Sequence, residues 1–131
     1  MAAPLCVVLW NANGLSNHKL ELQTFLTMYK IDIALVSETH FTSRSVFKIP
    51  HYTVYHTIHP DDTVHGGAAV IIRSYILHHE LPHHQSAKIQ ATTVQLSPSS
   101  IAPETHHIYR GLHHAIPIPG SSLPTWRRLE R

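Results

Sequence analysis

The sequence is informative first for what it lacks. Its 131 residues include a single cysteine, Cys6, so an internal disulfide is excluded and a reducing compartment is expected. No apolar run approaches the ~18 residues that a membrane-spanning helix requires. No basic segment precedes the first apolar stretch, LCVVLW, which argues against a secretory signal peptide. These absences predict an intracellular protein without a membrane anchor.

An excess of charge of one sign is also lacking. Ten Lys and Arg residues face eight Asp and Glu residues, and the net charge of +2 is too small to indicate nucleic-acid binding by itself. Apolar residues make up 43% of the chain, which is enough for a packed core, and the length fits one domain or part of one. Histidine is abundant instead: its 14 residues outnumber Lys and Arg together and would make the chain strongly cationic at mildly acidic pH.

Hydrophobic periodicity in the first 38 residues predicts a strand–helix–strand unit. Residues 5–10 and 31–38 are apolar runs typical of buried strands, and residues 18–30 between them follow a helical pattern. The expected buried face of that helix consists of Leu22, Phe25, Leu26 and Tyr29. Ser16 or Asn17 is expected to cap its amino terminus. Two strands joined in this way must run parallel, with a right-handed connection.

The following segments predict antiparallel pairing. Residues 52–59 alternate and are rich in β-branched and aromatic side chains, and residues 68–73 form another apolar run, so the two are expected to pair as a hairpin with a long loop. Residues 75–81 and 89–96 are further strand candidates. Residues 1–96 are therefore predicted to form a mixed α/β sheet.

Residues 97–131 differ in character from the rest. Five of the nine prolines lie between Pro98 and Pro124, and no hydrophobic period continues through this segment. We expect a divergent Pro/His-rich tail that is poorly ordered, in which only HHIYRGL (106–112) is a candidate strand.

Polar side chains follow the ends of the two predicted parallel strands. Asn11 and Asn13 follow the first strand and Glu38 follows the second. The carboxyl ends of parallel strands share one edge of the sheet, where ligands bind, and neighbouring strands lie about 4.8 Å apart. Asn11 and Glu38 are therefore expected to face one small ion or phosphate, and a lone carboxylate with waters and phosphate oxygens suits Mg²⁺. An ordinary turn, which Asn and Gly also favour, is the open alternative.

Three motifs in a fixed order carry a family resemblance. They are WNANGL (10–15), SETH (37–40) and HGGAAVIIR (65–73). In this combination the chain resembles the amino-terminal half of the endonuclease–exonuclease–phosphatase superfamily. It is more closely similar to the apurinic-type endonuclease domain of jockey-like non-LTR retrotransposons, over about residues 5–96.

The resemblance implies a fold, a reaction and partners. The fold would be α/β (α+β), the amino-terminal half of a four-layer α/β sandwich with a mixed, largely antiparallel sheet. The parent activity would be divalent-metal-dependent hydrolysis of a phosphodiester, with Mg²⁺ or Mn²⁺ as cofactor and DNA as the partner that is nicked. The parent polyprotein would also carry a reverse transcriptase and would act inside the cell, in the nucleus.

The resemblance also implies roles for single residues. Asn11 matches a catalytic asparagine that would orient phosphate or water, and Asn13 and Glu38 match metal-binding positions. His40 ends the second motif, where the family pattern assigns it no chemistry, and Arg44 lies four residues further on; both are candidates for contacts with the substrate backbone. For these last two the open alternative is a solvated loop side chain.

The family pattern is incomplete in this chain. Its G-D-x-N and S-D-H motifs are missing from the sequence, so no general base is assigned. Tyr109 suits the position of the family's catalytic tyrosine, but Arg-Gly-Leu stands where Cys-Pro-Pro would follow, and an ordinary strand tyrosine is the alternative. Whether the chain is an enzyme is therefore open. We expect residues 1–96 to be a partial domain whose sheet lacks a covering partner, with exposed apolar side chains and unpaired strand edges.

Two further interpretations stay open. The chain could belong to a phosphatase branch of the superfamily, or it could be a catalytically inactive fragment that binds metal through its histidine pairs at 78–84, 106–107 and 113–114. Adjacent side chains diverge in an extended chain, and the flanking prolines indicate exposed loops. No specific metal site is therefore predicted at these pairs.

Overall fold

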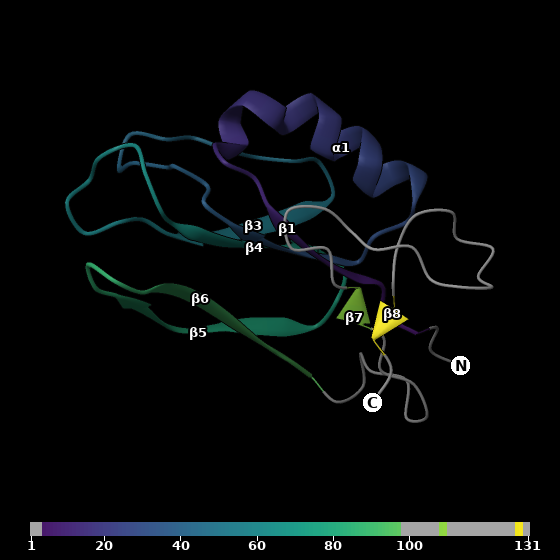
Figure 1. The fold of residues 1–131 in the computed structure, drawn as a ribbon. Coiled ribbons are helices and arrows are strands. Elements are labelled where there is room, and N and C mark those ends of the chain that lie inside the picture. The colour runs from purple at the N-terminus through teal and green to yellow at the C-terminus, as the bar shows by residue number, and fades with distance from the viewer. Residues whose placement is uncertain (1–3, 98–107, 110–127, 130–131) are drawn as a thin grey trace.

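The described part of the chain folds as an α-helix, a short 3₁₀ helix and two β-sheets, with the α-helix and the sheets stacked in layers (Figure 1). A computed structural model describes residues 4–97, 108–109 and 128–129. The elements are β1 (Val7–Asn11), the 3₁₀ helix η1 (Leu15–His18), α1 (Lys19–Met28), β2 (Ile33–Ser37), β3 (Tyr52–Thr57), β4 (Ala68–Arg73), β5 (His78–Gln85), β6 (Gln90–Leu96), β7 (Ile108–Tyr109) and β8 (Arg128–Leu129). The predicted α+β class is confirmed.

The larger sheet has six strands in the order β3-β4-β2-β1-β7-β8, and β5 and β6 form the second sheet. β1 pairs in parallel with β2 and with β7, whereas the other four strand pairs are antiparallel. The parallel strand–helix–strand unit and the antiparallel β3–β4 hairpin are therefore confirmed. Of the predicted tail, Ser97, β7 and β8 belong to the described residues.

Helix α1 covers one face of the large sheet with the side chains that its pattern predicts. Leu22 and Leu26 are buried, and Phe25 and Tyr29 pack half-buried beside them. The predicted cap is wrong: His18 precedes α1 and makes no side-chain cap hydrogen bond. Because η1 already turns residues 15–18 helically, Ser16 and Asn17 lie inside the helical segment instead of at its start.

The opposite face of the large sheet is covered by the β5–β6 sheet (Figure 1). Ile33, Val70, Ile72 and Ile76 are buried between the two sheets, with Val94 and Leu96 packed against them. The expectation that this face lacks a partner is therefore wrong over β3 and β4, because residues 78–96 supply one there. Leu35 in the neighbouring β2 keeps 36% of its surface exposed.

Strand β5 begins within the predicted strand segment 75–81 and continues through Pro82 to Gln85, so the expectation that the histidines of this segment lie in exposed loops is wrong. Residues 78–85 pair with β6, and the register shifts between Leu81 and His84, on either side of Pro82. Proline has no N–H for the ladder and is tolerated in strands at such irregularities. His78 is held internally, since its ring nitrogens contact the Ile76 carbonyl at 2.6 Å and the Tyr55 hydroxyl at 2.9 Å.

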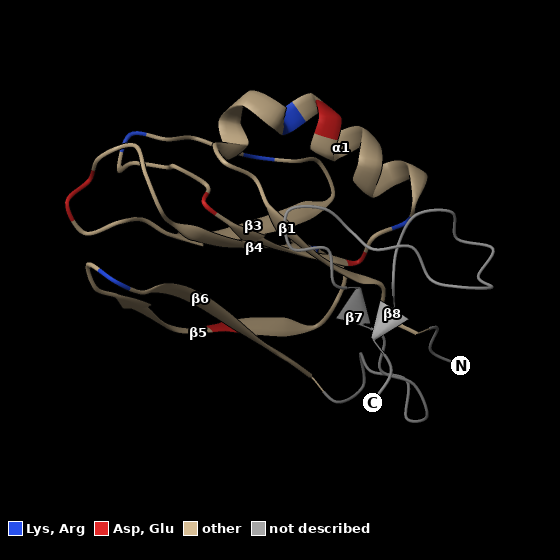
Figure 2. Cartoon of the chain, in the orientation of Figure 1, with Lys and Arg blue, Asp and Glu red and all other residues tan. Residues whose placement is uncertain are grey.

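Charged residues lie mostly in loops and on α1, and few lie in the strands, among them Arg73 in β4 and Glu80 in β5 (Figure 2). At the edge where β2 begins, an Asp32 side-chain oxygen accepts a 2.8 Å hydrogen bond from the Cys6 backbone, and Arg73 lies 3.4 Å from the other oxygen. Burial raises the pKa of Asp32 above its usual value, against the lowering influence of that hydrogen bond and of Arg73. In the described part of the chain, no helix is long and apolar enough to cross a membrane.

Replacing Ile72 tests the contribution of the covered second face. Ile72 is fully buried, so Ile72→Ala should lower the free energy of unfolding by about 2–5 kcal/mol. Ile89→Ala is the matched control, because the same side chain is 58% exposed there and its removal should cost about 0.5 kcal/mol or less. Urea denaturation followed by circular dichroism measures both, and equal losses would contradict the burial of Ile72.

Candidate functional site

The carboxyl ends of β1 and β2 bring Asn11 and Glu38 together. Asn11 is the last residue of β1 and pairs with Ser37, the last residue of β2, so Glu38 follows directly beyond the strand. The Nδ2 amide of Asn11 donates a hydrogen bond to Oε2 of Glu38. Both side chains are accessible, and about half of the Glu38 side chain is exposed.

Asn13 sets the orientation of the Asn11 side chain. Its backbone N–H donates to Oδ1 of Asn11 at 3.2 Å, and its φ of 46° is the left-handed conformation that asparagine tolerates. With Oδ1 occupied in this way, the Nδ2 group of Asn11 must face Glu38. The turn interpretation and the site interpretation are thus compatible. The predicted role of the Asn13 side chain as a metal ligand stays a prediction.

Residues 38–40 are held between two other segments by backbone hydrogen bonds. On one side, the N–H groups of Gly14 and Leu15 donate to the carbonyls of Glu38 and Thr39 at 2.8 and 2.9 Å. On the other side, the N–H groups of Glu38 and His40 donate to the carbonyls of the two glycines at 67 and 66, again at 2.8 and 2.9 Å. The segment that carries Glu38 is therefore fixed in position beyond the strand ends.

Left-handed backbone conformations concentrate in this region. Glu38 has a φ of 52° and His40 a φ of 60°, and Gly14, Gly66 and Gly67 also have positive φ. A side chain on Gly67 would meet Oγ1 of buried Thr39 at 2.5 Å and the Thr57 carbonyl at 3.2 Å. Glycine is thus required at position 67 for close backbone approach, and the Gly-Gly pair precedes a strand instead of opening a helix as a phosphate-binding loop would.

His40 lies beside the Asn11–Glu38 pair. Its Nε2 is 3.7 Å from Oε1 of Glu38, and its side chain is 21% exposed. A ring nitrogen of His40 therefore lies beside the Glu38 carboxylate, where it could contact an anion bound next to Glu38. The structure brings His40 to the site, and its contact with substrate stays a prediction.

Arg44 belongs to a separate loop. The contacts of this loop are to Asp62, whose carboxylate accepts hydrogen bonds from the backbone and hydroxyl of Ser43 at 2.7 and 2.6 Å. These hydrogen bonds, with a smaller contribution from Arg44, lower the pKa of Asp62 below its usual value. Asp62 thus ties two loops together, because its carboxylate accepts both hydrogen bonds from Ser43.

The position of Tyr109 follows from the backbone pairing of β7. This strand runs parallel to β1, and Tyr109 is opposite Val8. Asn11 lies three residues beyond Val8 along β1, which is roughly 10 Å at the usual rise of a strand. The expected strand at Tyr109 is thus present, and a catalytic role for the residue stays a prediction.

The residues at this edge fit a divalent cation of the Mg²⁺ type. Glu38 offers a half-exposed carboxylate, and the Asn11 amide beside it adds no charge that would repel a phosphate. Mg²⁺ is commonly held by one or two carboxylates, with waters and substrate oxygens completing the octahedron. Glu38 supplies one carboxylate, the smallest number that such Mg²⁺ sites use.

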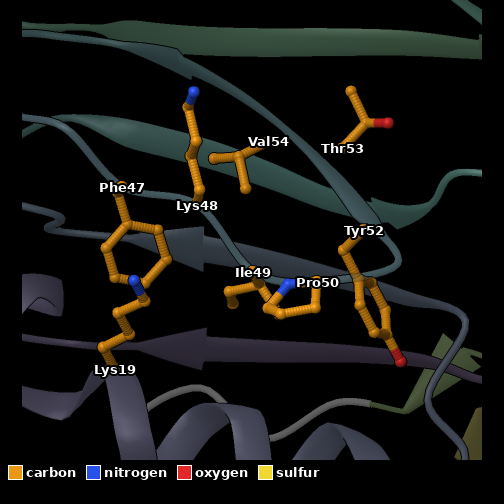
Figure 3. Close-up of a pocket in the computed structure, with 8 residues that line it drawn as sticks. All are labelled: Lys19, Phe47, Lys48, Ile49, Pro50, Tyr52, Thr53 and Val54. Atoms are coloured by element: carbon orange, nitrogen blue, oxygen red, sulfur yellow. The ribbon is translucent and has the colours of Figure 1, made fainter.

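The pocket drawn in Figure 3 is elsewhere. It lies between Lys19 at the start of α1 and residues 47–54, and the Lys19 ammonium is 5.8 Å from the centre of the Phe47 ring. Of the eight residues that line it, none is a predicted site residue. It therefore adds nothing to the Asn11–Glu38 site.

The sequence analysis missed a second group of chemically competent side chains. His59, Asp61 and His65 lie in the β3–β4 connection, with ligand atoms all within 4.8 Å of one another. Partial desolvation acts to raise the pKa of Asp61, but the hydrogen bonds that the Thr63 hydroxyl and backbone N–H donate to it outweigh this effect, so the pKa is lowered. The available signal was the spacing H-x-D-x-x-x-H, which stands in a turn-rich segment.

Comparison with known proteins relates the chain to retrotransposon products. It is 38% identical over 95 residues to the RNA-directed DNA polymerase from mobile element jockey of Drosophila melanogaster, which covers 72% of this chain and 10% of that protein. The corresponding protein of Drosophila funebris is 38% identical over 88 residues, 67% of this chain and 10% of the relative. The probable RNA-directed DNA polymerase from transposon BS of Drosophila melanogaster is 32% identical over 101 residues, 76% of this chain and 11% of the relative.

These relatives support the derivation of this chain from a retrotransposon open reading frame that encodes a reverse transcriptase. The chain spans about a tenth of the length of the relatives it matches. No protein-family model matches it.

Gly67→Ala tests whether the Gly-Gly turn positions the segment that carries Glu38. The new Cβ would meet Thr39 and backbone at φ +89°, so unfolding free energy should fall by more than about 1 kcal/mol. Gly66→Ala is the control, because its φ of +63° is better tolerated and its Cβ meets the flexible end of Gln90. Thermal unfolding measures both, and a loss at Gly66 as large as that at Gly67 would contradict the requirement.

Proposed function

We propose that this chain contributes the Asn11–Glu38 part of a divalent-metal-dependent endonuclease centre that nicks DNA for retrotransposition. The observation that carries the proposal is the contact between the Asn11 amide and the Glu38 carboxylate at the carboxyl ends of adjacent parallel strands. Open α/β sheets bind their ligands at this edge. Mg²⁺ or Mn²⁺ is the cofactor that we propose.

The chemistry of phosphodiester hydrolysis supports a division of roles at this edge. When bound, the metal would neutralise the negative charge that develops on the phosphate oxygens. Glu38 would hold it, and one hydrogen of the Asn11 amide, which the Glu38 contact leaves free, would donate to a phosphate oxygen or an attacking water. His40, beside Glu38, would contact the phosphate backbone.

The relatives support the context of the proposal. Their names are those of RNA-directed DNA polymerases from mobile elements. A DNA polymerase extends a free 3′-hydroxyl, and a nick in DNA supplies one. This chain would therefore act as one section of a longer polyprotein. The general base and the leaving-group acid are the parts of the centre that its described residues leave unassigned.

Nicking of supercoiled plasmid DNA by the purified chain tests the function. With Mg²⁺ or Mn²⁺, relaxed circles should form, and EDTA should abolish their formation. Glu38→Gln should lower the rate of nicking at least a hundredfold, because this carboxylate is the only charged ligand proposed for the metal. Glu21→Gln is the matched control, since Glu21 is an exposed glutamate on α1 that pairs with His18.

The outcome distinguishes an active endonuclease centre from a catalytically inactive fragment. Equal nicking by the wild type and Glu38→Gln would contradict the proposed role of Glu38 and indicate a contaminating nuclease. An inactive wild type would favour the alternative, a catalytically inactive fragment of the same parent domain.

Asn11→Asp tests metal binding without relying on catalysis. The substitution replaces the amide donor by a second carboxylate against Glu38, so the metal-free chain should lose about 1–3 kcal/mol of stability. Added Mn²⁺ should stabilise this variant more than the wild type, because two carboxylates bind a divalent cation more tightly than one. Thermal unfolding with and without Mn²⁺ measures the difference, and equal stabilisation of the two proteins would contradict a cation at Glu38.

A further inference from the structure

We propose that His59, Asp61 and His65 bind one Zn²⁺ ion in the β3–β4 connection, at a site separate from the Asn11–Glu38 pair. The three residues contribute two imidazoles and one carboxylate, a ligand set that zinc sites use together with a water in the fourth position. Among the residues that the structure describes, they are the one group of histidine, cysteine and acidic side chains whose ligand atoms converge.

The distances suit a tetrahedral zinc ion. Nδ1 of His59 lies 2.9 Å from Oδ1 of Asp61, and Nε2 of His65 lies 3.5 Å from Oδ2 of the same carboxylate. Ligand atoms around a tetrahedral Zn²⁺ with bonds of 2.0–2.2 Å are separated by roughly 3.3 Å. The observed separations lie on either side of this value, so small rotations of the side chains would complete the coordination. The two imidazole rings are already side by side, with centroids 4.0 Å apart.

Hydrogen bonds outside the group fix which nitrogen of His59 is free to bind. Its Nε2 contacts the carbonyl oxygen of Ala87 at 3.1 Å, which requires an N–H at Nε2. Its Nδ1 is the acceptor for the backbone N–H of Asp61 at 3.3 Å. The lone pair is therefore on Nδ1 and faces Asp61, as in metal-bound histidines whose other nitrogen donates to a carbonyl.

The same reasoning fixes the tautomer of His65. The Thr63 hydroxyl donates its one hydrogen to Oδ1 of Asp61 at 2.8 Å, so Nδ1 of His65, which also contacts this hydroxyl, must be the donor. The lone pair of neutral His65 is then on Nε2, the nitrogen that faces the other oxygen of Asp61. Thr63 thus orients both the carboxylate and the second imidazole.

This arrangement places two nitrogen lone pairs against a carboxylate. At 2.9 Å, the Nδ1 lone pair of His59 and the negative Oδ1 of Asp61 repel each other unless a positive charge lies between them. A proton or a metal ion could supply that charge. A metal ion is the species that would also engage His65, since the ligand atoms of all three residues lie within 4.8 Å of one another.

The surroundings favour zinc over the harder cations. Mg²⁺ and Ca²⁺ prefer oxygen ligands, whereas two imidazoles and one carboxylate suit zinc and related transition metals. His59 is largely buried, with 12% of its side chain exposed, whereas Asp61 and His65 are about half exposed. A metal ion could therefore enter from solvent and retain a water ligand.

Titration of the full chain with Co²⁺, a spectroscopic substitute for Zn²⁺, tests the site. One equivalent should produce visible absorption bands of tetrahedral Co²⁺, and Zn²⁺ should displace them. His65→Gln should weaken binding at least tenfold, because it removes a ligand at an exposed position where folding is little affected. The double variant His83→Gln, His84→Gln is the matched control, since it removes two exposed histidines of β5 and should leave the bands unchanged.

Thr63→Val provides an independent test that retains all three ligands. Loss of the hydroxyl that orients Asp61 and His65 should weaken Co²⁺ binding by about 10–100-fold while the chain stays folded by circular dichroism. Bands that survive His65→Gln but disappear in the His83, His84 variant would overturn the proposal in favour of loose histidine pairs. A chain that shows no saturable Co²⁺ bands would overturn it in favour of a proton between His59 and Asp61.

Discussion

The placement of residues 38–40 between two neighbouring segments is the constraint on which the rest of the site depends. Their backbone receives hydrogen bonds from Gly14 and Leu15 on one side and donates to the Gly-Gly pair at 66–67 on the other. This continues the hydrogen-bonding of β1, β2 and β4 beyond their ends, where parallel and antiparallel neighbours meet. Glu38 can therefore take a left-handed conformation and still present its carboxylate to Asn11, because the backbone on both sides is held in place.

The parts of the fold that the sequence predicts well are those with an unambiguous hydrophobic period. Apolar runs predict β1, β2 and β4 to within a few residues. The helical spacing of Leu22 and Leu26 predicts the buried face of α1. Burial on one or both faces determines such segments locally. The meeting of Asn11 and Glu38 was predictable for the same reason, since two strands joined through a helix must end at the same edge of their sheet.

Other features depend on contacts between distant segments, which a local pattern does not reveal. Pro82 and its neighbouring histidines indicate a loop when taken alone, yet this segment pairs with β6 and covers the second face of the sheet. The convergence of His59 with His65 is equally hidden, because its geometry rests on a turn and on the Ala87 carbonyl more than twenty residues away. The left-handed conformation of Glu38 has no signal of its own, since glutamate does not favour it.

The position of β7 next to β1 has a consequence for the order in which the sheet can be assembled during synthesis. β1, β2, β4 and β3 all lie within the first 73 residues, so they can pair as soon as that length of chain has emerged, because domains fold from the amino terminus as they are made. β7 follows only at residue 108, and until then one edge of β1 has open hydrogen-bonding groups. An exposed strand edge is a template for pairing with another chain. The nascent protein is thus most vulnerable to association with other copies during the translation of the segment between β4 and β7.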